Sequence, residues 1–200
     1  MATGHYAGVF IHNFPKKMAD MRVLGVWDKR FLKRPYDPAI GAKSLIDNGD
    51  VKVPGGMPED VRNGGGNRKE TPLETMAREG LSETGVQILM AEQVYLEEVV
   101  DRQTGGKHLR YFYIATRVSG LPELDSPIRE VDEANADGTK EHLYSCWLPL
   151  EQFAKQLYKG QRPAFGAILS WLARDSEKGA EFVDAFMPLL EQFPEPEPGV

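Results

Sequence analysis

The sequence predicts a mixed α/β fold in which a β-sheet is sandwiched between helices. Three observations support this prediction: extended segments come first, a helix with complete boundary signals follows, and more strands then precede a run of C-terminal helices. That order of elements is typical of a mixed sheet covered by helices on its two faces. The chain has 200 residues, which is enough for one such domain with extensions.

The N-terminal third of the chain is expected to supply strands. Residues 6–14 and 21–31 contain the β-branched and aromatic side chains that favour extended structure, and residues 51–53 form a third, short strand. A Pro-Gly-Gly turn at 54–56 ends that strand. Residues 57–69, which include three consecutive glycines, are expected to be a loop.

The helix that follows has unusually complete boundary signals. Thr71 is the expected N-cap, Pro72 occupies the first helical position, and Glu74 completes a capping box. Gly85 suits the left-handed residue that commonly ends a helix. The apolar arc that we expect to face the core consists of Leu73, Met76, Ala77, Gly80 and Leu81.

Strands and then helices are expected in the second half of the chain. The expected strands are residues 86–90, 93–100, 109–118 and 144–148, and the expected loop is 122–139. The expected helices are residues 150–159, 164–174 and 181–193, the last kinked or interrupted at Pro188. Residues 193–200 are expected to be a frayed tail. We therefore expect one domain over 1–175 and a helical extension with a proline-rich tail over 176–200.

Composition and charge exclude several classes of protein. The formal net charge of −6 argues against non-specific binding to nucleic acid, which needs a basic surface. The single cysteine, Cys146, excludes an intramolecular disulfide and a cysteine-based zinc site. No apolar run approaches the roughly 18 residues of a membrane-spanning helix, and no secretory signal is apparent. We therefore expect a cytoplasmic protein that does not enter membranes.

Two carboxylates of the central helix lie one turn apart. Glu79 and Glu83 are separated by four residues, at the edge of the apolar arc where the helix meets its packing partner. Like charges at this spacing destabilise an isolated helix. A divalent cation between them would remove that cost, and Mg²⁺ favours carboxylate oxygens together with substrate phosphates.

These residues resemble the Nudix hydrolase box, G-x5-E-x7-R-E-U-x-E-E-x-G-U, in which U is bulky and apolar. The positions that fit its spacing are Gly64, Glu70, Arg78, Glu79, Glu83, Gly85 and Val86. The Pro-Gly-Gly turn at 54–56 looks like the segment that leads into the box, and 147–151 resembles a Trp-hydrophobic-Pro-Leu segment of the family. The resemblance covers about residues 6–173, and it implies an α/β/α sandwich with a mixed sheet.

The chain departs from the family pattern in three ways. Ser82 replaces the first glutamate of the box's Glu-Glu pair, which puts the number of bound metals in doubt, and Gly80 replaces the bulky apolar residue. The third departure concerns the box glycine. If Gly56 fills that role, an insertion of about eight residues precedes Glu70; the alternative is that Gly64 is the box glycine.

The resemblance implies a role for each matching residue. Glu79 and Glu83, with the carbonyl of Gly56, are the expected ligands of Mg²⁺ or Mn²⁺, while Glu70 and Gly85 are structural positions of the box. Arg78 is expected to orient a neighbouring carboxylate. Relatives take a further acid from the loop before the tryptophan segment, where Glu141 is our candidate and the competing acids are Glu130 and Glu133.

Substrate contacts are expected from the strand at 109–118. Side chains alternate across a strand, so Tyr111 and Tyr113 share one face while Arg110 and Phe112 share the other. Aromatic rings commonly stack on nucleotide bases, and arginine commonly binds phosphate. Arg110 and Tyr111 are therefore the candidates for substrate binding, with the choice of face left open.

The family implies a metal-dependent pyrophosphohydrolase that acts on a nucleoside diphosphate linked to another group. Ser82 motivates an alternative, a catalytically weak or inactive module that binds a nucleotide. A related isomerase reaction is a third option, because a fold does not fix a function. The expected partner is a small nucleotide, and a homodimer would be consistent with the family.

Overall fold

The structure is a computed structural model that describes residues 4–63, 66–100, 105–134, 140–175 and 177–196. Its strands form two sheets and a separate hairpin. The first sheet has the order β3-β1-β7-β6, the second has the order β2-β9-β8, and β4 pairs with β5. The strands of the first sheet are β1 (His5–Phe10), β3 (Gly55–Gly56), β6 (Gln87–Val100) and β7 (Lys107–Ser119).

The remaining elements complete the architecture. The second sheet contains β2 (Arg22–Asp28), β8 (Arg129–Ala134) and β9 (Lys140–Pro149), and the hairpin contains β4 (Asp60–Asn63) and β5 (Gly66–Lys69). The helices are α1 (Pro72–Thr84), α2 (Leu150–Gln156), α3 (Arg162–Ala173) and α4 (Gly179–Gln192). Because β1 runs parallel to β7 whereas β6 and β3 are antiparallel to their neighbours, the first sheet is mixed, which confirms the predicted fold class.

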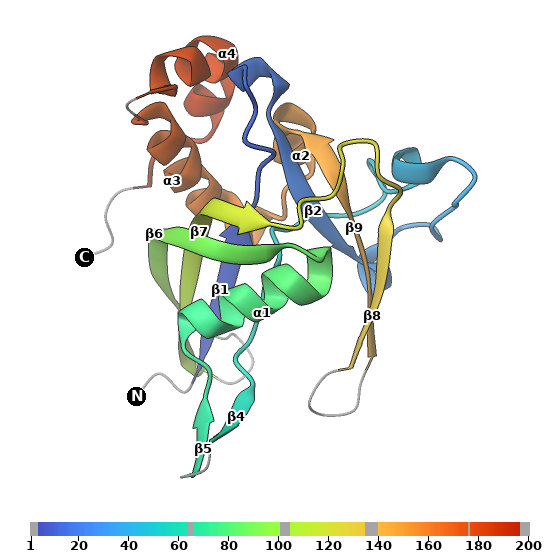
Figure 1. The fold of residues 1–200 in the computed structure, drawn as a ribbon, viewed down its shortest axis with the longest axis vertical. Helices are drawn as coiled ribbons and strands as arrows, with labels where there is room; N and C mark the ends of the chain where they lie inside the picture. The colour runs from blue at the N-terminus through green and yellow to red at the C-terminus, as the bar shows by residue number, and fades with distance from the viewer. Residues whose placement is uncertain (1–3, 64–65, 101–104, 135–139, 176, 197–200) are drawn as a thin grey trace.

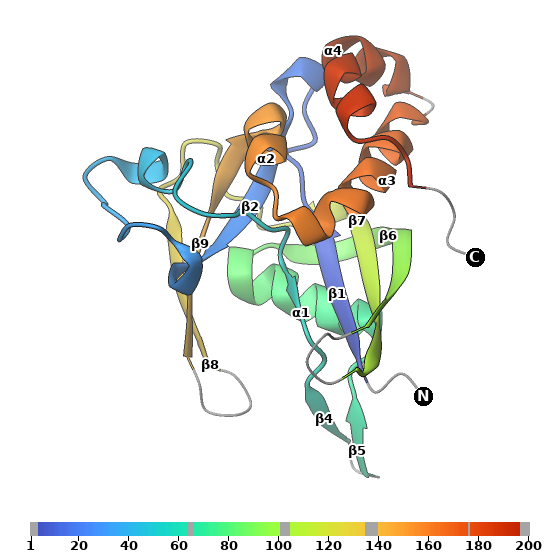
Figure 2. The same cartoon turned by 180° about the vertical axis from the view of Figure 1, so that it is seen from behind.

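Helices cover both faces of the first sheet, and each face has its own apolar cluster. Helix α1 packs on one face, where Met76 joins a cluster that includes Val9 and Tyr113. The opposite face carries the larger cluster, in which Phe112 packs with residues of α3 and α4 such as Phe165. Figures 1 and 2 show α1 and α3 on opposite sides of β1 and β7. The alternation predicted for residues 109–118 is therefore confirmed.

Several expected boundaries differ from the observed ones. Residues 57–69 are not a loop, because they contain the β4–β5 hairpin, and the expected loop at 122–139 contains β8. The β4–β5 hairpin and strand β8 are both rich in charged and small residues, so they lack the apolar alternation by which a strand is recognised. The two strands expected between 86 and 100 are one continuous strand, β6. Its pairing with β7 has an irregular register at several positions.

The orientation of α1 also differs from the prediction. Leu73 and Leu81 were expected to face the core, but they are 54% and 51% exposed. The buried side of the helix instead presents Thr75, Glu79 and Glu83. Thr75 binds Glu70 and His5, and Glu83 accepts the N–H of Gly55 on β3. The helix is therefore turned by its hydrogen bonds as well as by its apolar residues.

The C-terminal region is packed against the main core. Helix α4 is kinked at Phe186, where the backbone has φ −129° and ψ 23°, two residues before Pro188. A kink near Pro188 was predicted. The expectation that residues 193–200 form a frayed tail is wrong for its first residue, because the Phe193 side chain is buried against Phe165. No helix of the described residues is both long and apolar enough to span a membrane.

Candidate active site

Local sequence signals fix both ends of the helix that carries the acidic pair. The Thr71 hydroxyl accepts the N–H of Glu74, and the Glu74 carboxylate accepts the N–H of Thr71 at 2.8 Å. At the other end Gly85 has φ 77°, and its N–H donates to the carbonyl of Leu81. Both predicted caps are confirmed, so the register of the intervening side chains is set by the helix itself.

Glu79 and Glu83 lie buried between α1 and the glycine turn. They are only 6% and 7% exposed. The N–H of Gly55 donates to Glu83 Oε2 at 2.8 Å. A Cβ built on Gly56 would lie 2.0 Å from Glu79 Oε1, so a side chain there would occupy the place of the carboxylate. The structure thus places Gly55 beside Glu83 and Gly56 beside Glu79.

Arg78 connects the acidic pair to the loop before the helix. Its guanidinium forms an ion pair with Glu79 at 2.9 Å and with Glu70 at 3.0 Å, and it donates to the carbonyl of Met57 at 2.9 Å. Burial alone would lower the pKa of Arg78, but Glu70 and the charge of Glu79 raise it above its ordinary value. Arg78 therefore stays charged and can hold the Glu79 carboxylate in one orientation.

Glu70 anchors the base of the β4–β5 hairpin. Its Oε2 accepts the N–H of Glu59 at 3.0 Å and the hydroxyl of Thr75 at 3.1 Å. The backbone completes this link, since the N–H of Glu70 donates to the carbonyl of Glu59. Burial would raise the pKa of Glu70, but these hydrogen bonds and Arg78 hold it below its ordinary value. Glu70 is thus a charged structural residue that connects hairpin to helix.

The donor set at this site fits one divalent cation. Within the described ranges no group of three or more His, Cys, Asp or Glu side chains is arranged to hold a metal. The hydroxyl of Ser82 is 3.4 Å from the carbonyl of Glu79, in its own helix. Mg²⁺ in proteins is commonly held by one or two carboxylates together with several waters. Two buried carboxylates beside a glycine backbone match that requirement for a single ion.

The two candidate substrate-binding residues lie on opposite faces of the first sheet. Arg110 forms an ion pair with Glu97 at 2.9 Å, and its guanidinium carbon is 5.6 Å from the centre of the Tyr6 ring. The Tyr6 hydroxyl lies beside Gly55, where an added Cβ would approach it to 2.8 Å, and the N–H of Gly55 binds Glu83. Burial and then the charge of Glu83 raise the pKa of Tyr6. Tyr111 instead packs on the α1 side, edge-on to His5. The geometry therefore brings Arg110, rather than Tyr111, near the glutamates through Tyr6.

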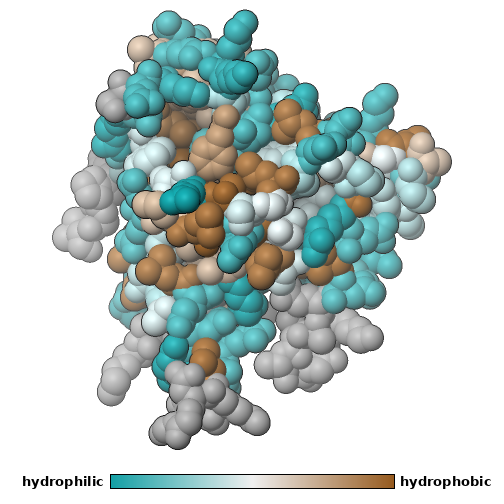
Figure 3. All heavy atoms as spheres, viewed as in Figure 1, coloured by the Kyte–Doolittle hydropathy of each residue, from teal (hydrophilic) through white to brown (hydrophobic). Residues whose placement is uncertain are grey.

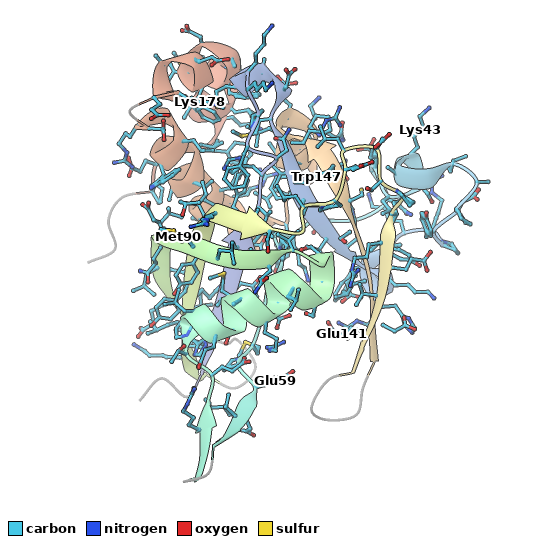
Figure 4. All side chains as sticks on the ribbon, in the orientation of Figure 1. Lys43, Glu59, Met90, Glu141, Trp147 and Lys178 are labelled. Atoms are coloured by element: carbon cyan, nitrogen blue, oxygen red, sulfur yellow. The ribbon has the colours of Figure 1, made fainter. Side chains whose placement is uncertain are left out.

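Glu141 has different neighbours from the α1 glutamates. It forms an ion pair with Arg30, which also binds Asp28 through two nitrogen atoms. Figure 4 shows Glu141 near the start of β9, across from α1. Among the competing acids, Glu130 faces Tyr144 across the β8–β9 ladder, whereas the Glu133 side chain lies outside the described residues. Gly64 also lies outside them.

The sequence did not reveal a cavity of about 470 Å³, part of whose lining comes from the residues just before the glycine turn. The Lys52 ammonium lies 5.2 Å from the centre of the Phe31 ring and 5.8 Å from that of Tyr158. The residues that line this cavity are Asp28, Phe31, Lys33, Gly49, Asp50, Lys52 and Tyr158. One signal could have indicated it: Lys52 is the polar residue between Val51 and Val53, and both valines are buried.

Comparison with known proteins identifies the family. The NUDIX domain matches residues 19–168 of this chain. No curated protein matches the chain. The MutT NUDIX hydrolase of Burkholderia pseudomallei has a similar structure, with a TM-score of 0.50 and 20% identity over 82% of this chain and 97% of that one.

Two further solved structures resemble this chain at lower TM-scores. The NUDIX domain of Shewanella oneidensis NrtR, complexed with ADP ribose, has a TM-score of 0.49 and 14% identity, covering 86% of this chain and 90% of that one. The ORF135 protein of E. coli has a TM-score of 0.48 and 15% identity over 87% and 94% of the two chains. The family match over three quarters of the chain is the stronger finding, and it confirms the predicted class of enzyme, hydrolases of phosphoric anhydride bonds. The chain belongs to the NUDIX domain family.

Proposed function

We propose that this chain hydrolyses a pyrophosphate bond in a nucleoside diphosphate linked to another group, with Mg²⁺ or Mn²⁺ as cofactor. The observation that carries the proposal is the burial of two carboxylates, Glu79 and Glu83, against the Gly55–Gly56 backbone. Removing two such charges from water is costly unless a cation compensates them. Arg78 forms an ion pair with Glu79, and a divalent ion would add positive charge beside the two carboxylates.

The surrounding residues would hold the carboxylates and the substrate in place. A bound divalent ion would neutralise phosphate charge and lower the pKa of a bound water. Arg78 restrains Glu79, and the N–H of Gly55 restrains Glu83, so both carboxylates are oriented before the substrate binds. Such preorganisation favours the reaction because no reorientation is needed in the transition state.

The Phe31–Lys52–Tyr158 cavity is our candidate for the nucleoside end of the substrate. Two aromatic rings suit base stacking, and two lysines, Lys33 and Lys52, suit a phosphate or an acidic group. Lys52 is three residues from Gly55, which corresponds to roughly 10 Å of extended chain. This distance would place the scissile phosphates at the carboxylates while the nucleoside occupies the cavity.

Turnover of a nucleotide panel by the full chain, with and without Mg²⁺ or Mn²⁺, tests the proposal. We expect hydrolysis that a chelator abolishes. Glu83→Gln should lower kcat by about 100-fold or more. The fold should survive, because a glutamine oxygen can still accept the N–H of Gly55. Glu191→Gln, an exposed glutamate of α4, is the matched control and should retain full activity. A Glu83→Gln enzyme with unchanged turnover would refute the assignment.

A second candidate function is a nucleotide-binding module without catalysis. The observation that favours it is Ser82, which offers a hydroxyl where the family has a carboxylate, so the site has fewer acidic ligands. In that case nucleotides should raise the melting temperature, and those that bind more tightly should raise it further. Such stabilisation without turnover under any divalent metal would favour the module over the enzyme.

A further inference from the structure

A second cavity, of about 400 Å³, lies away from the acidic helix and shares no lining residue with the candidate active site. It is lined by the segment after β1, the β6–β7 pair, the end of α3 and the turn before α4. Figure 4 shows Lys178 of this cavity at one end of the molecule and Glu59 of the hairpin base toward the other. This volume falls within the range of small-molecule sites.

The backbone at the edge of this cavity is strained. Phe14 has φ 46°, in the left-handed region that non-glycine residues rarely adopt. Asn13 holds the segment on both sides, since its carbonyl oxygen accepts the N–H of Arg22 and its amide donates to the carbonyl of Asp20. The result is an aromatic ring that lines the cavity while remaining 38% exposed. Strain of this kind persists where the surrounding structure enforces it, and it is common at ligand sites.

His12 presents a defined hydrogen-bond donor. Its Nδ1 accepts the N–H of Phe14 at 3.1 Å, so the proton of the neutral ring is on Nε2. Burial, and then the charge of Lys178, lowers the pKa of His12 to about 4, so the ring is neutral near pH 7. The cavity thus has an uncharged N–H donor on its wall.

The opposite wall is also oriented by hydrogen bonds. The indole N–H of Trp171, on α3, donates to Glu92 Oε2 of β6 at 3.1 Å. Irregular register between Met90 and Ala91 leaves Thr116 of β7 without a partner residue in the ladder, where it lines the cavity. Bulges of this kind often redirect side chains beside binding sites. The space-filling view shows apolar side chains gathered on the front face of the molecule, below the polar surface of α4 (Figure 3).

The charges around this cavity disfavour an anion. Three carboxylates line it, from Glu92, Asp175 and Glu177, against the single ammonium of Lys178. That ammonium already donates to the carbonyl of Pro15. A phosphate would therefore meet net negative charge, whereas an amino group would find acceptors. This preference is the reverse of the one expected at a nucleotide hydrolase site.

We propose that this cavity is a second ligand site, which binds an unphosphorylated amino-heteroaromatic molecule of the size of a nucleobase or nucleoside. Phe14 and Trp171 contact its planar ring, His12 Nε2–H donates to a ring nitrogen, and the carboxylates accept its exocyclic amine. The site is separate from the hydrolase site, so its occupancy does not depend on the proposed function.

Calorimetric titration of the full chain with adenosine, inosine and AMP tests this proposal. We expect saturable binding of adenosine, weaker binding of inosine, which lacks the amine, and weaker binding of AMP, which adds a phosphate. Phe14→Gly should weaken adenosine binding by about 10-fold or more. Glycine suits the left-handed backbone, so this variant should fold. Glu92→Gln retains an acceptor for Trp171 but removes a charge, and it should narrow the preference for adenosine over AMP.

Phe31→Ala separates this site from the active site, because Phe31 lines the cavity proposed for the nucleoside end of the hydrolase substrate. Its adenosine affinity should equal that of the unmodified chain, whether or not the hydrolase assignment is correct. Three results would overturn the proposal: no saturable binding of adenosine, binding that is insensitive to Phe14→Gly, or binding that Phe31→Ala abolishes. AMP binding that is as tight as adenosine binding and equally weakened by Phe14→Gly would also contradict it, because the carboxylates would then exert no selection.

Discussion

At the scale of single residues, Gly56 decides how closely the backbone approaches the acidic pair. The Glu79 carboxylate occupies the place where a side chain at position 56 would begin. Arg78 holds that carboxylate from the other side, so it has little room to move away. A methyl group at position 56 would therefore displace a proposed metal ligand without removing it.

We predict that Gly56→Ala lowers kcat by about 100-fold, because an error of about 1 Å in a reacting group can have an effect of that size. Steady-state kinetics at saturating Mg²⁺ would measure it. Gly4→Ala is the matched control, since an added Cβ there meets only Met57 Cε at an ordinary contact distance of 3.7 Å. Full activity in Gly56→Ala would show that Glu79 tolerates the displacement and would count against its role as a ligand.

At the scale of elements, the β4–β5 hairpin and the helix α1 are joined by one carboxylate. Glu70 binds the backbone of Glu59, the hydroxyl of Thr75 and the guanidinium of Arg78. It is 9% exposed, and its pKa is held below the ordinary value of 4.5. A carboxyl group whose pKa is lowered on folding stabilises the folded state above its ordinary pKa.

The stability that Glu70 contributes should be present in full above pH 4.5 and lost as the pH falls through its lower folded pKa. We therefore predict that Glu70→Gln is less stable at neutral pH and loses less stability on acidification than the unmodified chain. Denaturant unfolding between pH 7 and pH 3 measures how the free energy of unfolding of each protein changes with pH, with Glu191→Gln as control. Parallel pH profiles for the unmodified chain and Glu70→Gln would be inconsistent with this account.

The sequence predicts elements best where the signals are local. The caps of α1 were predictable because Thr71, Glu74 and Gly85 act on their own backbone. The rotation of α1 was not, because the hydrogen bonds that bury Glu83 come from Gly55, which is distant in sequence. Hairpin β4–β5 and strand β8 also escaped prediction, since their sequences contain too few apolar residues to produce a periodic pattern.

In the candidate site, too, contacts within one element were predictable and contacts between distant segments were not. The spacing of Glu79 and Glu83 predicts that they share one face, because it is a property of one helix. The aromatic cavity could not be predicted, since Phe31, Lys52 and Tyr158 come from three separate segments that only the complete fold brings together. The same holds for the ion pair between Arg30 and Glu141, which spans 111 residues.

At the scale of the whole molecule, the C-terminal helices share a core with the sheet. Phe182 of α4 is fully buried, and it belongs to the same cluster as Phe112 of β7. The NUDIX match ends at residue 168, before this helix begins. The division that we predict near residue 175 therefore depends on whether α4 unfolds with the domain or separately.

Phe182→Ala distinguishes the two cases. Truncation of a fully buried phenylalanine commonly lowers the free energy of unfolding by about 3–5 kcal/mol. If α4 belongs to the cooperative unit, we predict a loss of that size in a single denaturant transition. Met187 lies on the same helix and is 45% exposed, so Met187→Ala should change the midpoint of the denaturant transition little. A separate early transition in Phe182→Ala, with the main midpoint unchanged, would instead support an independent extension.

The paired ends of the β4–β5 hairpin have a practical consequence for anyone who wishes to label this protein. Asp60 and Lys69 form an ion pair at the hairpin base, where Glu59 and Glu70 are also joined. In Figures 1 and 2 the two strands project from the body of the molecule. A reporter group or affinity tag inserted between Asn63 and Gly66 would be carried by the paired strands of the hairpin. We expect it to leave the proposed active site at α1 undisturbed.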